Sequence, residues 1–99
     1  MAVNVMVKRV PRAGVWANMN MVLRELRTLG MNQPGYISGE TMLSATDRGT
    51  TLVVSTWGHI DDWKAYEVLP QRKDLLDKLE PLLAEPSTIE VWIESPVIG

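Results

Sequence analysis

The stretch that decides the fold is TTLVVSTWGHIDDWKAYEVLPQRKDLLDKLEPLL, residues 50–83. Its first part, up to Trp57, is rich in β-branched and apolar residues, a composition that predicts a strand. Gly58 breaks this pattern, and the next segment carries Trp63 and Tyr66 at helical spacing. Three of the six aromatic residues are therefore expected where a strand end meets a helix, and such a junction can form the wall of a small-molecule pocket.

A proline divides the rest of this stretch into two helices. Pro70 lacks an amide hydrogen and would clash inside a helix, but it is well suited to the first helical position. We therefore predict a short helix to about Val68 and a second helix from Pro70 to Leu83, whose regular part ends near Pro81. Leucines at three- and four-residue spacing would form the apolar face of the second helix.

Outward from this stretch, alternating residues predict three more strands. Residues 2–9 and 88–94 alternate with period two, and so do residues 36–44, which Asp47 to Gly49 would connect to residues 50–57 as a hairpin turn. Within residues 36–44, the alternation places Ile37, Thr41 and Leu43 on one side and Tyr36, Ser38, Glu40 and Met42 on the other. Between the first two strands, residues 15–29 show helical spacing, and Gly30 is predicted to follow the helix end as its C′ residue.

The predicted order is β-α-β-β-α-β, which is typical of an α+β, ferredoxin-like fold with a four-stranded antiparallel sheet and helices on one face. A chain of 99 residues is expected to form a single domain over residues 1–99. Both sides of most strands carry apolar residues, although a sheet face without helices should be polar. We therefore predict a homodimer that packs two sheets face to face.

Composition excludes several classes of function. The net charge is -2 with scattered Lys and Arg, which argues against nucleic-acid binding. No apolar run approaches the length of a membrane span, and no signal-peptide pattern is evident. Cysteine is absent, which excludes disulfides and thiolate chemistry and fits a reducing compartment, so a cytoplasmic location is expected. Asp61 and Asp62 are adjacent on a helix and cannot both face one ion, so no metal site is predicted.

Three segments in this order resemble the antibiotic-biosynthesis monooxygenase (ABM) domain family: GYISGETM at residues 35–42, STW at residues 55–57, and DWKAY at residues 62–66. The resemblance covers nearly the whole chain. It implies a dimeric α+β barrel, in agreement with the two apolar sheet faces. In this family a Trp ends the third strand, an aromatic residue lies in the next helix, and an arginine is often found near Arg72.

The resemblance also implies a choice of activities. The family includes cofactor-independent oxygenases of polyphenols and quinols, haem-degrading oxygenases and members of unknown role. The Asn, Trp and His set of the haem-degrading group corresponds here to Lys8, Tyr66 and Leu76, and His59 lies too early to replace the missing ligand. Haem degradation is therefore not expected, and no cofactor is predicted.

Candidate catalytic residues are Asn4, Tyr66 and His59. Asn4 could hydrogen-bond a substrate hydroxyl or an enolate-like oxygen, or it could be a polar strand residue that faces water. The Tyr66 hydroxyl could bind a phenolic oxygen, or the ring could belong to the core. His59 could act as a general base, although a histidine after Gly58 is more typical of a helix cap.

Candidate substrate-binding residues are Trp57, Trp63, Tyr36 and Arg72. Each tryptophan could lie over a flat aromatic substrate or simply fill the core. Arg72 could bind an anionic substrate or face solvent beside Lys73 and Asp74.

Two functions follow as alternatives. The first is a monooxygenase that oxidises a small phenol or quinol without a cofactor, in a pocket between sheet and helices. The second is a non-catalytic homodimeric module of the same fold that binds a hydrophobic metabolite or serves in a stress response. A pocket of about 300 Å³ or more with convergent polar groups would favour a ligand site.

Overall fold

The computed structural model describes residues 1–95 of the chain. In chain order its elements are β1 (Val3–Arg9), α1 (Trp16–Met31), β2 (Tyr36–Leu43), β3 (Thr51–Trp57), α2 (Ile60–Glu67), α3 (Pro70–Leu79), the 3-10 turn η1 (Glu80–Leu82) and β4 (Thr88–Ile93). The predicted α+β class and the β-α-β-β-α-β order are confirmed. The division at Pro70 is also confirmed, because this proline is at the start of α3.

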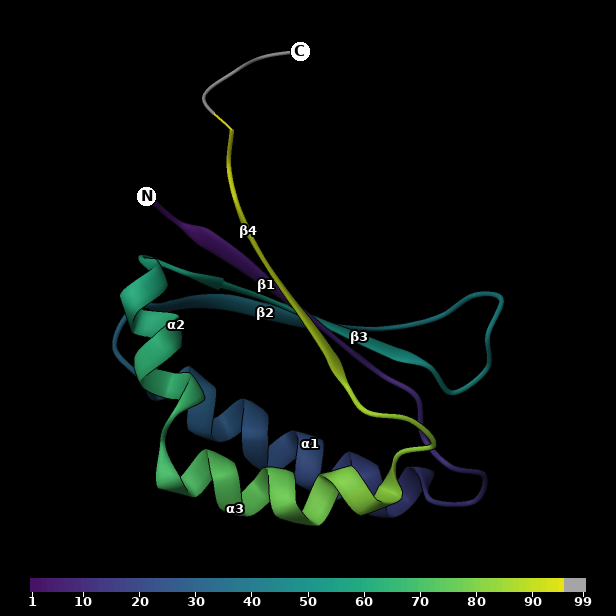
Figure 1. Cartoon of the computed structure of the whole chain (residues 1–99). Helices are drawn as coiled ribbons and strands as arrows, with labels where there is room; N and C mark the ends of the chain where they lie inside the picture. Colours follow the sequence, from purple (N-terminus) through teal and green to yellow (C-terminus); the bar gives the residue numbers. More distant parts are fainter. Residues whose placement is uncertain (96–99) are drawn as a thin grey trace.

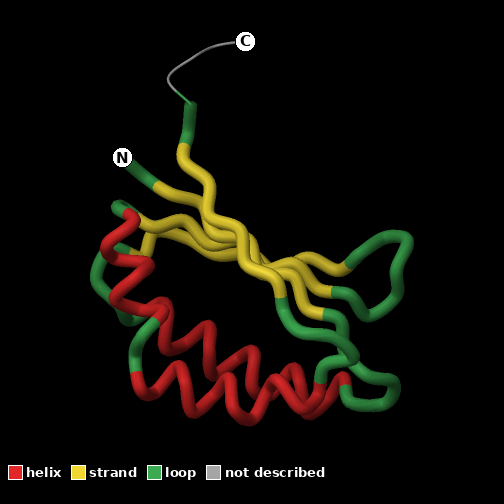
Figure 2. The backbone as a smooth tube through the Cα atoms, in the orientation of Figure 1, coloured by secondary structure: helices red, strands yellow, loops and turns green. Residues whose placement is uncertain are grey.

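The four strands form one antiparallel sheet in the order β2-β3-β1-β4. The central strand β1 pairs Val5 with Ser55 of β3 on one side and with Val91 of β4 on the other. All helices lie on one face of the sheet, with α1 and α3 side by side beneath it and α2 at one end (Figures 1 and 2). At the end where β3 meets α2, the aromatic side chains Trp57, Trp63 and Tyr66 lie between the two layers.

Two groups of buried side chains hold the layers together. The first joins the valines of β1 to the aromatic junction and consists of Val3, Val5, Val7, Trp57, Trp63 and Tyr66. The second lies between α1, α3 and the chain after η1 and consists of Met19, Leu26, Leu79 and Leu83. The predicted apolar faces of both helices are therefore used against each other, as ordinary helix amphipathicity requires.

A bulge in β2 changes the predicted facing of one residue. Tyr36 pairs with Trp57, but the next pair joins Ser38 to Thr56, so Ile37 is an extra residue. The bulge places Tyr36 on the helix-facing side of the sheet, together with Thr41. The prediction that Tyr36 shares a side with Ser38 was wrong, because strict period-two alternation cannot anticipate an inserted residue.

Gly30 was also predicted wrongly as a residue outside the helix. It lies inside α1, which continues to Met31 and is capped at Asn32. A Cβ added at Gly30 would lie 3.4 Å from the ring and hydroxyl of Tyr66. The glycine therefore serves close packing of α1 against α2, and not helix termination.

The helix-free face of the sheet carries a mixture of apolar and polar side chains. Pairing partners place Met6 and Val54 on this face, and Asn4 opposite Trp92 on the same face. Trp92 and Met42 are exposed, and so are Ile89 and Val91 on the other side of the edge strand β4. Within residues 1–95, no helix has the length and hydrophobicity that a membrane span needs.

Candidate functional site

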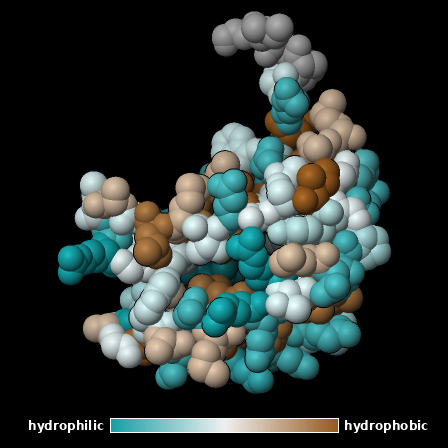
Figure 3. Space-filling model, turned by 180° about the vertical axis from the view of Figure 1, so that it is seen from behind, coloured by the Kyte–Doolittle hydropathy of each residue, from teal (hydrophilic) through white to brown (hydrophobic). Residues whose placement is uncertain are grey.

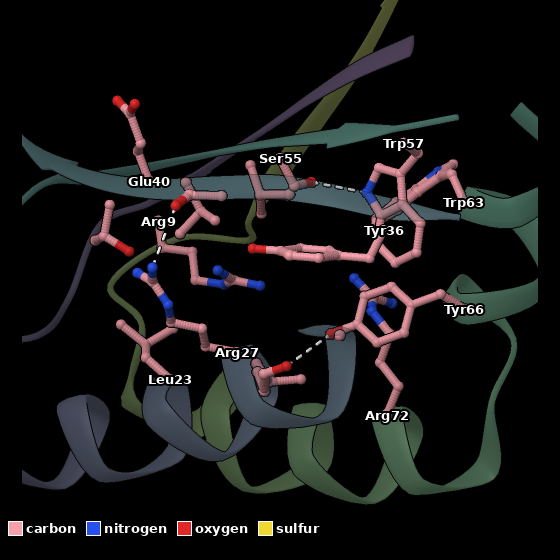
Figure 4. Close-up of a pocket in the computed structure, with 16 residues that line it drawn as sticks. Arg9, Leu23, Arg27, Tyr36, Glu40, Ser55, Trp57, Trp63, Tyr66 and Arg72 are labelled. Atoms are coloured by element: carbon pink, nitrogen blue, oxygen red, sulfur yellow. Dashed lines mark hydrogen bonds between the residues drawn. The ribbon is translucent and has the colours of Figure 1, made fainter. Parts of the chain in front are cut away.

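A pocket lies between the sheet and the helices at the aromatic junction. Strands β1, β2 and β3 form its roof, and α1, α2 and α3 form its floor (Figure 4). On the side of the molecule where β2 and α1 lie, the surface has a recess with hydrophobic atoms inside and hydrophilic residues around it (Figure 3). The cavity volume is about 80 Å³.

Four aromatic rings form one end of this pocket. Trp57 is in the middle: it stacks on Tyr66 with ring centroids 5.1 Å apart and meets Tyr36 edge-on at 5.4 Å. The ring centroid of Trp63 lies 6.0 Å from that of Trp57 and 5.8 Å from that of Tyr66. The predicted gathering of aromatic residues is confirmed, and the bulge in β2 adds Tyr36 to it. Such edge and stacked pairs stabilise the fold beyond the area they bury, so this wall is rigid.

The polar atoms of two of these rings are held by the protein. The Trp57 Nε1 donates a hydrogen bond to Ser55 Oγ at 3.0 Å, and the Tyr66 hydroxyl donates to the Leu26 carbonyl oxygen at 3.1 Å. Burial raises the pKa of Tyr66 above its usual value, while the nearby positive charges of Arg72 and Arg9 oppose this shift. Tyr66 is therefore neutral near pH 7, and its oxygen keeps lone pairs that can accept a hydrogen bond from a ligand.

Arg72 enters the pocket from the first turn of α3. Only 5% of the residue is exposed, so the alternative that it faces solvent was wrong. Its guanidinium carbon lies 5.3 Å from the ring centroids of both Trp63 and Tyr66, and one nitrogen donates to the Glu67 carbonyl oxygen at 3.3 Å. The two rings favour a cation at this position. The burial of Arg72 could not be predicted from the residues next to it in the sequence, because Lys73 and Asp74 lie on other sides of the helix and are exposed.

Arg9 is a pocket residue that the sequence analysis did not single out. It ends β1 on the same side as the three buried valines, and only 4% of it is exposed. Burial and the positive charge of Arg72 lower its pKa to about 10, against a smaller raising effect of Glu80. The sequence does indicate that Arg9 faces the helices, because the period-two alternation of Val3, Val5 and Val7 continues to residue 9.

A third arginine lies at the mouth of the pocket. Arg27 of α1 is exposed, and its Nη2 donates a hydrogen bond to the Gly39 carbonyl oxygen of β2 at 3.2 Å (Figure 4). Glu40 also lies at the rim, but its carboxylate points away from the cavity (Figure 4). The Tyr36 ring lies over Gly39, where an added Cβ would collide with the Tyr36 hydroxyl. The pocket thus has four aromatic rings with Arg72 against them at one end, and Arg9 and Arg27 toward the other (Figure 4).

The structure does not bring Asn4 or His59 into this pocket. Asn4 lies on the helix-free face, where its Oδ1 accepts a hydrogen bond from Thr56 Oγ1 at 2.9 Å. His59 is the exposed N-cap of α2, and its Nδ1 accepts from the amide of Asp61 at 3.1 Å. The cap alternative for His59 is confirmed. The other predicted residues, Trp57, Trp63, Tyr36, Tyr66 and Arg72, all line the one pocket.

The size of the cavity limits what it can enclose. A volume of about 80 Å³ is below the range of roughly 300–1,000 Å³ that is typical of sites enclosing drug-sized ligands. It is sufficient for a small group and not for a fused ring system. Within residues 1–95, no three His, Asp or Glu side chains are grouped as metal ligands would be.

Comparison with solved structures defines the class of protein. A candidate antibiotic biosynthesis monooxygenase from Nitrosomonas europaea superposes with a TM-score of 0.87 at 14% identity, over 99% of this chain and 94% of that chain. A conserved protein from Methanosarcina mazei superposes with a TM-score of 0.90 at 12% identity, over 96% of this chain and 94% of that chain. SnoaB, a cofactor-independent oxygenase from Streptomyces nogalater, superposes with a TM-score of 0.82 at 14% identity, over 99% of this chain and 98% of that chain.

These comparisons agree on the fold. The chain has the ABM fold, as the sequence resemblance implied. No protein-family model matches the sequence, and no curated protein sequence matches it either. Because the identities are this low, what is shared is the architecture, and the activity has to be argued from the side chains.

Proposed function

We propose that this protein is an oxygenase that oxidises a small, electron-rich phenol or quinol without a cofactor, in the pocket between sheet and helices. The observation that carries the proposal is the juxtaposition of a four-ring aromatic wall with buried guanidinium groups in one cavity. The aromatic wall suits a flat ring, and the positive charge favours the electron-rich phenolate form of the substrate. The fold of SnoaB, a cofactor-independent oxygenase, supports the same activity.

The chemistry needs little from the protein. A phenol with a free para carbon and one O₂ give a para-quinone and one water: one oxygen atom joins the ring and the other leaves with the two hydrogens lost by the substrate. The phenolate supplies the first electron to oxygen, so the pocket has to hold the ring, stabilise negative charge and exclude bulk water. In this role the Tyr66 oxygen would accept a hydrogen bond from the neutral phenol as it binds, before the phenol loses its proton to solvent, and Trp57 would hold the ring.

The alternative is a non-catalytic homodimeric module that binds a hydrophobic metabolite. The small cavity favours this alternative, because much of the aromatic wall packs against itself. Asn4 and His59, which were candidates for catalysis, lie outside the pocket and have no role in the proposed reaction.

Oxygen consumption distinguishes the two functions. With single-ring phenols that have a free para carbon, the purified protein should consume one O₂ per substrate oxidised, as followed with an oxygen electrode and by product absorbance. Tyr66→Phe keeps the ring against Trp57 but removes the hydroxyl, so kcat/KM should fall about tenfold, the effect of one lost hydrogen bond.

The matched control for this experiment is Trp16→Phe, an aromatic change at an exposed position outside the pocket. It should leave kcat/KM unchanged. Oxygen uptake no faster than in protein-free solution, across the whole panel and with ligands that demonstrably bind, would favour the non-catalytic module.

We propose a cytoplasmic homodimer as the functional form. The helix-free face and the edge strand β4 expose apolar side chains that a second copy would cover, and Trp92 is 53% exposed among them. Trp92→Glu should convert the dimer to a monomer in sedimentation velocity at micromolar concentration, because it would bury a charge in the interface.

Val68→Glu is the control for this prediction. Val68 is 77% exposed at the end of α2, away from the sheet, and the substitution should leave the dimer intact. A wild-type protein that sediments as a monomer at the same concentration would rule the dimer out.

A further inference from the structure

Neither of the two buried arginines in the pocket makes a direct ion pair among residues 1–95, although Glu80 is near enough to raise the pKa of Arg9. The Nε atoms of Arg9 and Arg72 are both buried without a hydrogen-bond partner among residues 1–95. The ion pairs in this part of the chain join His59 to Asp61 and Lys73 to Asp77, so neither pocket arginine is included. An unpaired buried charge is unfavourable, and two of the same sign in one cavity are more so. A negatively charged group bound between the two arginines would remove this cost.

The two guanidinium groups reach the same cavity from opposite layers. Arg9 comes from β1 in the sheet, and Arg72 comes from α3 in the helical layer (Figure 4). Burial, and after it the positive charge of Arg72, lower the pKa of Arg9 to about 10, which still leaves the side chain protonated near neutral pH. The hydroxyl end of Tyr36 points toward Arg9 and adds a further polar group at this place (Figure 4).

We propose that the pocket binds an aromatic carboxylate, with the carboxylate group between Arg9 and Arg72 and the ring against Tyr36 and Trp57. The claim that the substrate is an aromatic carboxylate rests on the proposed oxygenase function. The claim that the pocket binds such a molecule does not depend on that function. The electron-rich phenol or quinol of the proposed reaction is then a hydroxylated aromatic acid.

Charge and shape favour a carboxylate over other groups. A guanidinium presents a planar set of donors that matches the two oxygens of a carboxylate, and such charge-assisted bonds are stronger than neutral ones. A simple phenolate brings one negative charge against two buried cations, whereas a hydroxylated aromatic acid brings two in its phenolate form. The cavity volume of about 80 Å³ favours one ring, part of which would extend into the mouth between β2 and α1.

The test compares an acid with its neutral isostere. Calorimetric titration of the full-length protein at pH 7 and low ionic strength would use 2,3-dihydroxybenzoate, whose hydroxyls both have a free para carbon, with 2,3-dihydroxybenzamide and acetate. The acid should bind about 10- to 100-fold more tightly than the amide, as expected for charge-assisted hydrogen bonds. Acetate has the charge without the ring and should bind more weakly than the aromatic acid.

Variants locate the effect. Arg9→Met and Arg72→Met should each weaken binding of the acid about tenfold and weaken binding of the amide less, so that the preference for the acid falls. Arg24→Met removes an exposed arginine of α1 that lies outside the pocket, and it should change neither affinity. Without ligand, Arg9→Met should melt no lower than the wild type, because it removes one of two unpaired buried charges; a clearly lower melting temperature would mean that the charge is satisfied within the protein.

Other outcomes would overturn the inference. Equal affinities for acid and amide, or no heat of binding with the acid up to about 10 mM, would remove the carboxylate site. Acetate binding as tightly as the aromatic acid would leave only a general anion site. Arginine-dependent binding of the acid without any oxygen consumption would retain the subsite and reject the oxygenase, so the two proposals fail separately.

Discussion

Trp57→Ala is expected to lower the free energy of unfolding by about 4 kcal/mol, a value in the usual range for removing a buried aromatic side chain. Trp57 is 1% exposed and contacts Tyr36, Trp63 and Tyr66. Its loss would remove the central ring of the aromatic wall and leave a cavity that its stacked neighbours cannot fill. Since a domain of this size is stable by only about 5–15 kcal/mol, the loss is a large fraction of the total.

Urea denaturation followed by circular dichroism, at one fixed protein concentration, measures this effect. Trp16→Ala is the control, because Trp16 is exposed at the start of α1 and its loss should cost only about 0.5 kcal/mol. If Trp57→Ala does not fold, Trp57→Phe keeps a ring against Tyr66 and should show an intermediate loss. A change below about 1 kcal/mol for the alanine variant would show that the wall is not part of the core.

Gly35→Ala is expected to lower the free energy of unfolding by about 3 kcal/mol. Gly35 has a φ of 82°, which disfavours any residue with a Cβ, and a Cβ here would collide with the Asp62 carboxylate. Asp62 lies in the first turn of α2, where its negative charge stabilises the helix. The Gly35 carbonyl oxygen also accepts a hydrogen bond from the Gly58 amide at 2.7 Å, so the change would disturb the junction of β2, β3 and α2.

Gly14→Ala separates the backbone cost from the collision. Gly14 has a nearly equal φ of 79°, but a Cβ there would meet nothing within 4 Å. Its substitution should therefore cost only the backbone term, about 1 kcal/mol. The difference between the two variants in their loss of unfolding free energy, measured by chemical denaturation, gives the cost of the collision with Asp62. Equal losses would show that this collision does not contribute.

Much of the fold could be predicted because its signals are local. Period-two alternation marked the strands, helical spacing marked the helices, and Pro70 marked the start of α3. The two errors in the fold concern tertiary events: the bulge that turns Tyr36 toward the helices, and the packing of Tyr66 that keeps Gly30 inside α1. Neither leaves a trace in the spacing of apolar residues, because each depends on a partner far away in the chain.

The candidate site was predicted in part for the same reason. Trp57, Trp63 and Tyr66 are close in sequence, so a strand-to-helix junction was enough to bring them together. The prediction that Asn4 belongs to the site was wrong because a strand residue can face either side of the sheet. In β1 the odd-numbered residues face the helices, and Asn4 faces the other way.

By itself, then, the sequence determined the order of elements, the sheet and the place of the aromatic junction, because these follow from local patterns of apolar residues, prolines and glycines. The tertiary structure alone decided that Arg9 and Arg72, which are far apart in the chain, share one cavity, with the Nε atom of each buried and without a hydrogen-bond partner. Burial is a property of the packed layers: the same arginine is solvated on an open helix and loses its water only when a sheet closes over it.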